Sequence, residues 1–131
     1  SRKPATSETV ENKEHFLKMN GKEVFKFAVT VIPDTVAKTL EKAGMEMSDI
    51  DLIVPHQANY RIVSAAAKKM NYPEEKFYMN LNKLGNTSGA SIGLALTEAY
   101  ENGLVKKGDN LVFVGFGAGL SYASLVLKWA Y

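Results

Sequence analysis

A histidine and an asparagine lie in two loops where polar side chains can meet a substrate. His56 lies in the loop of residues 55–59, after a run of branched apolar residues that predicts a buried strand. The carboxyl end of such a strand is where ligands bind in many α/β proteins. A neutral imidazole there can donate a hydrogen bond from Nε2 to an oxyanion, and the amide of Asn86 in a later loop can do the same. Both residues are therefore candidates for stabilising negative charge.

Each candidate also has a structural explanation. A single histidine at the end of a strand often has a structural or capping role. Residues 86–88, Asn-Thr-Ser, are of the types that most often cap helices. The residues of either loop, taken alone, are compatible with both a catalytic and a structural role.

A glycine-rich run at residues 115–119 also follows a predicted strand. It resembles a dinucleotide-binding loop, but that motif requires a helix to follow, so that the helix N-terminus meets the pyrophosphate. Residues 122–129 have the pattern of a strand instead. We therefore interpret the glycines as a tight turn whose backbone N–H groups can face a substrate.

Basic residues gather after His56. Arg61 and Lys68 are seven positions apart, which places them on one face of a predicted helix, and Lys69 follows directly. Lys26 on an earlier predicted helix is a further candidate. Such a group is either a solvated basic face or a phosphate-binding surface, and the sequence pattern leaves both open.

The order of the predicted elements indicates an α/β fold class. Strands are predicted at residues 15–19, 50–54, 77–81, 111–115 and 122–129, and helices at residues 23–44, 58–70 and 88–101. This order predicts a mixed β-sheet layered with helices. Small residues crowd the first turns of the last helix, which predicts that it is buried in the centre of the molecule.

The bulk composition is that of one soluble domain. Of the 131 residues 46% are hydrophobic and 23% charged, and the formal net charge of +2 is too small to indicate nucleic acid. No apolar run is long enough to span a membrane, so we expect a cytoplasmic protein. The chain has no cysteine, hence no thiolate nucleophile and no thiolate metal site. Residues 1–13 are expected to be a flexible tail or linker remnant, and residues 14–131 the domain.

Three segments together resemble one family of condensing enzymes. They are PHQANYRI at residues 55–62, GNTSGAS at residues 85–91 and FGAGLSYAS at residues 116–124. In this order and spacing they resemble β-ketoacyl-acyl carrier protein synthase III, which starts fatty acid synthesis. The resemblance runs from about residue 19 to the last residue and implies a thiolase-like fold of two similar halves, of which this chain is the C-terminal one.

The resemblance implies an acyltransferase that joins an acyl-CoA primer to malonyl-acyl carrier protein by decarboxylative Claisen condensation. His56 and Asn86 correspond to the two residues that donate hydrogen bonds to the thioester oxygen and so stabilise the enolate. Each donor is worth on the order of 3 kcal/mol, so losing either side chain should reduce the rate ~100-fold or more. The cysteine that holds the acyl group belongs to the family's N-terminal half. We therefore expect this chain alone to be inactive in condensation.

The resemblance also assigns the remaining site residues. Phe116 and Ala118 belong to the turn beside the oxyanion, where the family commonly has three glycines and this chain has Gly-Ala-Gly. The residues implied in binding carrier protein or coenzyme A are Lys26, Asn59, Arg61, Lys68 and Lys69. The implied partners are the acyl carrier protein, coenzyme A thioesters, the N-terminal half and, in the full-length protein, a second copy in a homodimer. No resident cofactor and no metal are implied.

Two alternatives remain beside this hypothesis. One is a chain-elongating or polyketide-type relative, although elongating synthases typically use two histidines where this chain has His56 and Asn86. The other is a non-catalytic module that binds carrier protein or associates with itself. The absence of cysteine is compatible with that module.

Overall fold

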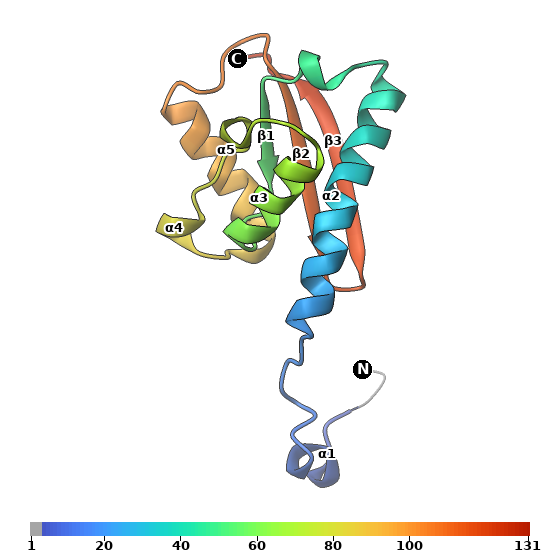
Figure 1. Cartoon of the computed structure of the whole chain (residues 1–131). Coiled ribbons are helices and arrows are strands. Elements are labelled where there is room, and N and C mark those ends of the chain that lie inside the picture. Colours follow the sequence, from blue (N-terminus) through green and yellow to red (C-terminus); the bar gives the residue numbers. More distant parts are fainter. Residues whose placement is uncertain (1–3) are drawn as a thin grey trace.

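A computed structural model describes residues 4–131, in which helices lie on both faces of a mixed sheet and a tail extends from the body (Figure 1). The helices are α1 (Ser7–Glu11), α2 (Gly21–Ala43), α3 (Tyr60–Lys69), α4 (Leu81–Leu84) and α5 (Ser91–Glu101). The strands are β1 (Leu52–Pro55), β2 (Asn110–Gly117) and β3 (Ser121–Lys128). Short 3₁₀ helices span Met47–Asp49, Glu74–Lys76 and Ser88–Ala90. No helix within residues 4–131 is long and apolar enough to cross a membrane.

The described strands form one sheet in the order β1-β2-β3. β1 pairs with β2 in parallel, with Val54 opposite Phe113, and β2 pairs with β3 antiparallel, with Phe113 opposite Leu125. Every residue of β1 is buried, as expected for a strand that is covered on both faces. The predicted α/β class with a mixed sheet is therefore confirmed.

Alternate residues of β2 build two separate cores. Val112 and Val114 face α2 and α3, and together with Ile32 they belong to the larger apolar cluster. Leu111 and Phe113 point to the opposite face and pack with residues of α5. The sheet therefore positions α3 and α5, the two helices that flank the candidate loops, relative to each other.

The long helix predicted at residues 23–44 is confirmed, and both of its ends have a local cause. The side chain of Asn20 accepts a hydrogen bond from the Glu23 backbone N–H at 3.3 Å, which caps the start. Gly44 ends the helix in the left-handed conformation, with φ at 66°. Buried apolar residues along one face of α2 pack against β2, β3 and α3.

Gly44→Ala is expected to lower the free energy of unfolding by about 1 kcal/mol, because a Cβ is disfavoured at positive φ. Gly21→Ala is the matched control: Gly21 is also exposed, does not have positive φ, and no atom lies within 4 Å of where its Cβ would be. Urea denaturation of the two variants measures the difference. Equal midpoints for both would contradict the role of the left-handed cap.

Two of the predicted strands are wrong or incomplete. Residues 15–19 form no strand and are exposed, because the described chain offers no partner strand to satisfy their backbone groups. The segment at residues 77–81 makes a single parallel bridge from Phe77 to Ile53, supported by a hydrogen bond from Tyr78 N–H to the Ile53 carbonyl at 2.8 Å. It then turns into α4 instead of extending the sheet.

The last predicted helix is not buried on all sides. Its buried strip consists of Ser91, Ala95 and Ala99, which are four residues apart and face the sheet. Gly93 and Leu94 lie on the exposed side. The helix is therefore not buried in the centre of the molecule as predicted, and one face of α5 is exposed in this chain.

Candidate active site

His56 follows the last residue of β1 and is held there by the sheet. Its backbone N–H donates to the Val114 carbonyl at 2.8 Å, which continues the ladder between β1 and β2 beyond the strand. Its ring packs edge to face on Phe116, with ring centroids 5.4 Å apart. Burial lowers the pKa of His56 below its ordinary value of 6.5. The imidazole is therefore neutral at pH 7 and keeps one N–H group to donate.

Asn86 lies in the loop between α4 and the 3₁₀ helix Ser88–Ala90. Its side-chain Oδ1 accepts a hydrogen bond from the Ser88 backbone N–H at 3.0 Å. Because the oxygen is used in this local turn, the amide NH₂ is the part of the side chain that can donate to a ligand. Asn86 is exposed, so its amide group is accessible to a ligand.

One open cavity of about 420 Å³ brings the two candidate loops together. The predicted residues on its wall are His56, Asn86, Phe116 and Ala118. They come from the end of β1, the loop after α4 and the end of the β2–β3 hairpin, which the chain separates by tens of residues. The structure therefore places two hydrogen-bond donors and the predicted turn around one space.

Ser91, the first residue of α5, also lines this cavity, and it was not predicted as a site residue. Its Oγ lies 2.6 Å from His56 Nδ1 and 3.3 Å from the Gln57 backbone nitrogen. The side chain is almost fully buried, at 1% exposure. No local pattern pairs a helical serine with a histidine 35 residues earlier. The only hint was its position among the small residues after Asn86.

A buried hydrogen-bond network behind His56 was also missed. Gln57 donates from Nε2 to the carbonyls of Pro55 at 2.8 Å and Tyr78 at 3.1 Å. Its Oε1 accepts from the Asn80 backbone N–H at 3.0 Å. The Asn80 side chain then donates to Glu98 of α5 at 2.7 Å. The network thus ties the histidine loop to the segment that leads to Asn86.

The network ends at the surface, on α4. Lys83 forms an ion pair with Glu98, and its hydrogen bond holds the pKa of the Glu98 carboxyl below its ordinary value. The pair joins α4 to α5 on either side of the loop that carries Asn86.

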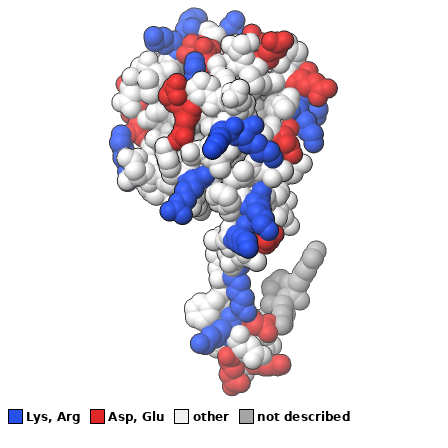
Figure 2. Space-filling model, in the orientation of Figure 1, with Lys and Arg blue, Asp and Glu red and all other residues white. Residues whose placement is uncertain are grey.

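The predicted basic residues lie on the surface and not on the cavity wall. Arg61, Lys68 and Lys69 are exposed on α3, and Lys26 is exposed on α2, where it pairs with Glu23 at 3.1 Å. Figure 2 shows Lys and Arg side chains in the lower half of this face, where α3 and the start of α2 lie. Among the described residues, none of these four lines the cavity.

Asn59 has a structural task. Its Oδ1 accepts the Arg61 backbone N–H at 2.9 Å and caps the start of α3. The cap fixes the direction in which α3 leaves the histidine loop. Any contact of Asn59 with a ligand must use the amide nitrogen of the same side chain.

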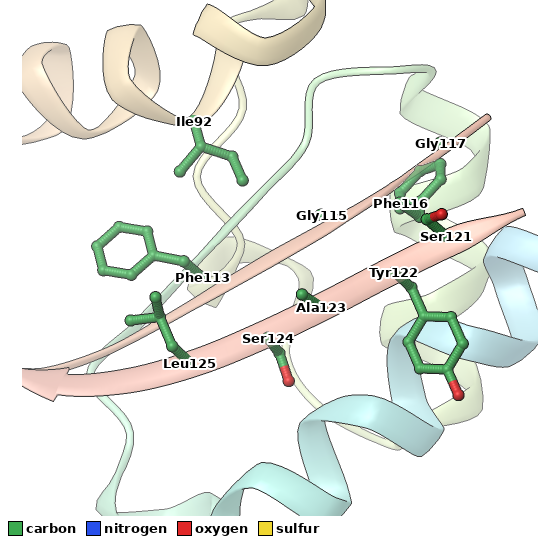
Figure 3. A pocket seen from close by; sticks show the side chains of 10 residues that line it. All are labelled: Ile92, Phe113, Gly115, Phe116, Gly117, Ser121, Tyr122, Ala123, Ser124 and Leu125. Carbon is green, nitrogen blue, oxygen red and sulfur yellow. The ribbon is translucent and has the colours of Figure 1, made fainter. Parts of the chain in front are cut away.

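A second depression, of about 450 Å³, continues from the cavity along the open side of the sheet. The two share Ile92, Phe116 and the backbone at Gly115 and Gly117. Figure 3 shows Ile92 pointing from α5 toward the strands, where Phe113 and Leu125 lie side by side. This surface is mainly apolar, and Leu125 is half exposed.

His56 is expected to make the protein less stable as the pH falls below about 6.5. Because its pKa is lowered in the folded protein, the unfolded chain takes up a proton at this residue first. Its contribution to stability is therefore complete above the unfolded value of 6.5 and is lost as the pH falls through 6.5 toward the folded pKa. Urea midpoints between about pH 7.5 and 5.5 should fall less in His56→Gln than in the parent chain. If the urea midpoints of the two chains fell equally with pH, the loss of stability would not come from His56.

Comparison with known proteins gives a consistent result. Residues 40–129 match the family described as 3-oxoacyl-[acyl-carrier-protein (ACP)] synthase III C terminal. The chain is 55% identical to β-ketoacyl-[acyl-carrier-protein] synthase III of Fusobacterium nucleatum over 131 residues, which are 100% of this chain and 40% of that protein. It thus spans about 40% of the length of this curated relative.

Solved structures of the same enzyme share the fold. The synthase III of Pseudomonas aeruginosa matches with a TM-score of 0.87 and 40% identity, covering 98% of this chain and 40% of that one. The Thermus thermophilus enzyme matches with a TM-score of 0.84 and 50% identity, covering 86% of this chain and 35% of that one. The thiolase-like α/β fold expected from the sequence is therefore confirmed.

Proposed function

The chain belongs to the 3-oxoacyl-[acyl carrier protein] synthase III family, and on this premise we propose that it supplies the histidine and asparagine of a decarboxylative condensing site. The observation that carries the proposal is that His56 and Asn86 line one cavity although they lie on separate loops. A neutral imidazole and a carboxamide are the donors that an enolate oxygen needs. The active protein is an acyltransferase that uses an acyl-CoA primer and malonyl-acyl carrier protein.

The reaction divides into two steps at this cavity. The bond between the malonyl carboxylate and the α-carbon breaks, carbon dioxide leaves, and the electron pair moves onto the thioester oxygen as an enolate. His56 Nε2–H and the Asn86 amide donate to that oxygen. The α-carbon then attacks an acyl group held on a cysteine, and the cysteine thiolate leaves. Preorganised donors in a site sheltered from water act mainly on the charged intermediate, and thus on the rate of the chemical step.

The acyl-carrying cysteine must come from outside this chain, which contains none. The chain spans 40% of the Fusobacterium nucleatum relative, and we place the nucleophile in the remaining part of such a protein. The test is a graft in which these 131 residues replace the matching segment of that relative. The graft is expected to condense acetyl-CoA with malonyl-acyl carrier protein, and the isolated chain is expected not to. A folded graft without condensation would refute the proposal.

The exposed cations of α3 support an acidic partner, and we assign them to the acyl carrier protein. Arg61→Glu or Lys69→Glu is expected to weaken carrier binding about five-fold, equivalent to ~1 kcal/mol, because each reverses a charge at the edge of the contact. The effect should shrink as salt is raised. Lys107→Glu is the control, since this exposed lysine lies outside α2 and α3. Fluorescence anisotropy of labelled carrier measures all three variants.

A non-catalytic binding module is the second candidate, and the open face of α5 favours it. Leu94 on α5 is 42% exposed, and Leu125 on β3 is 50% exposed in the wall of an apolar depression; exposed apolar surface of this kind is what protein partners cover. The graft separates the two functions. Carrier binding without condensation favours the module, whereas condensation favours the enzyme.

A further inference from the structure

We propose that Ser91 is a positioning residue that holds His56 in the tautomer with its proton on Nε2. The proposal rests on the proposed function only for its catalytic consequence, because the tautomer itself is a property of this chain. Ser91 touches the imidazole from the side opposite to the donating nitrogen. Its hydrogen bond determines which ring nitrogen carries the proton, and thus whether the nitrogen that faces the cavity can donate.

The geometry puts a hydroxyl against the nitrogen that must stay unprotonated. Ser91 Oγ and His56 Nδ1 are 2.6 Å apart, which is a short hydrogen bond. Only one of the two atoms can donate. If the serine donates, Nδ1 is the acceptor and the ring proton is on Nε2; if Nδ1 donates, the ring proton is turned away from the substrate.

The backbone of Gln57 decides between the two arrangements. Its N–H donates to Ser91 Oγ at 3.3 Å, so the serine oxygen already accepts one hydrogen bond. If it also accepted from His56 Nδ1, its own O–H would need another acceptor, although the side chain is only 1% exposed. Within residues 4–131, the hydrogen-bond partners that the structure gives Ser91 Oγ are the Gln57 N–H and His56 Nδ1, and of these two only Nδ1 can accept. The serine therefore donates to Nδ1.

The surroundings favour a neutral ring that can accept this bond. His56 is partly buried against Phe116, and burial keeps its pKa low. A protonated ring would carry hydrogen on both nitrogens, and the hydrogen on Nδ1 would then prevent this atom from accepting the hydrogen bond of Ser91. The apolar contact with Phe116 and the Ser91 hydroxyl thus both favour the neutral form of the ring.

The consequence for catalysis is a donor that is ready before the substrate arrives. With the proton fixed on Nε2, no tautomer exchange is needed when the enolate forms. Loss of the Ser91 hydroxyl in the graft is therefore expected to lower kcat about ten-fold while KM changes little, since the interaction matters in the charged state more than in substrate binding.

Nitrogen-15 NMR of the isolated chain tests the tautomer directly. The chain has only two histidines, and protonated and unprotonated ring nitrogens resonate far apart. His15 is exposed, with its ring against that of its neighbour Phe16 at a centroid distance of 4.3 Å, and it serves as the internal reference for a solvent-exposed ring. Above pH 7, where the lowered pKa keeps the His56 ring neutral, this residue is expected to show a single form with hydrogen on Nε2.

Two variants complete the test. In Ser91→Ala the His56 signals are expected to move toward the averaged values of His15, whereas Ser88→Ala, which removes an exposed hydroxyl on the same cavity wall, should leave them unchanged. Hydrogen on Nδ1 in the parent chain, or an unaltered tautomer in Ser91→Ala, would overturn the proposal. An inactive graft whose His56 still carries its hydrogen on Nε2 would refute the proposed function and leave this inference standing.

Discussion

Replacing His56 by alanine in the graft is expected to lower the rate of malonyl-acyl carrier protein decarboxylation at least ~100-fold. In the proposed function the neutral ring, partly buried at the end of β1, supplies one of two donors to the enolate oxygen. Its removal withdraws stabilisation that exists mainly in the transition state, so kcat should fall and KM should change little. Carbon dioxide release under single-turnover conditions is the measurement. His15→Ala is the matched control, because it removes the other histidine, which is exposed in the tail region.

Asn86→Ala belongs to the same prediction and should have a similar effect, again ~100-fold or more. Asn82→Ala is its control, since Asn82 is an exposed asparagine on the neighbouring helix α4. The double variant should lose less than the product of the two single effects if both donors act on one oxygen, as proposed. Full activity of either single variant would remove that residue from the mechanism.

Gln57→Leu is expected to lower the free energy of unfolding by about 3 kcal/mol, the second large effect. Leucine keeps most of the volume but leaves the Pro55 carbonyl, the Tyr78 carbonyl and the Asn80 N–H without their partner in the interior. Each buried polar group that loses its partner costs about 1–3 kcal/mol.

Urea denaturation, followed by the fluorescence of the single tryptophan, Trp129, measures this loss. Asn82→Ala is expected to change the stability by less than about 0.5 kcal/mol and serves as a surface control. A change in Gln57→Leu as small as in the control would mean that the network is not required for folding.

Local patterns predicted the parts of the fold that have local causes. The helix at residues 23–44 was predictable because apolar residues recur on one face and a glycine stands at its end. The loop of His56 was predictable because it follows a clear strand pattern, and the loop of Asn86 because it precedes a clear helix pattern. That they share a cavity depends on the parallel pairing of β1 with β2, which residue patterns do not specify.

Long-range contacts explain what the sequence did not predict. Residues 15–19 have the composition of a strand but find no partner in the described chain, and a strand is stable only within a sheet. Ser91 and Gln57 are ordinary polar residues until the fold brings them to His56 and Asn80. Their importance comes from burial, which is a property of the tertiary structure.

Ser91 is also the first residue of the buried strip of α5. The position of this helix therefore affects which nitrogen of His56 carries the proton. An α-helix advances about 1.5 Å per residue, whereas a short hydrogen bond is lost once it lengthens by about 1 Å. Because Ser91 Oγ and His56 Nδ1 are 2.6 Å apart, a slide of α5 that lengthens this contact by about 1 Å, less than the rise of one residue, would break the hydrogen bond. The exposed side of α5 carries Leu94, where a packing partner could hold the helix in place along its axis. A partner that held α5 in this axial position would thereby favour the His56 tautomer with its proton on Nε2.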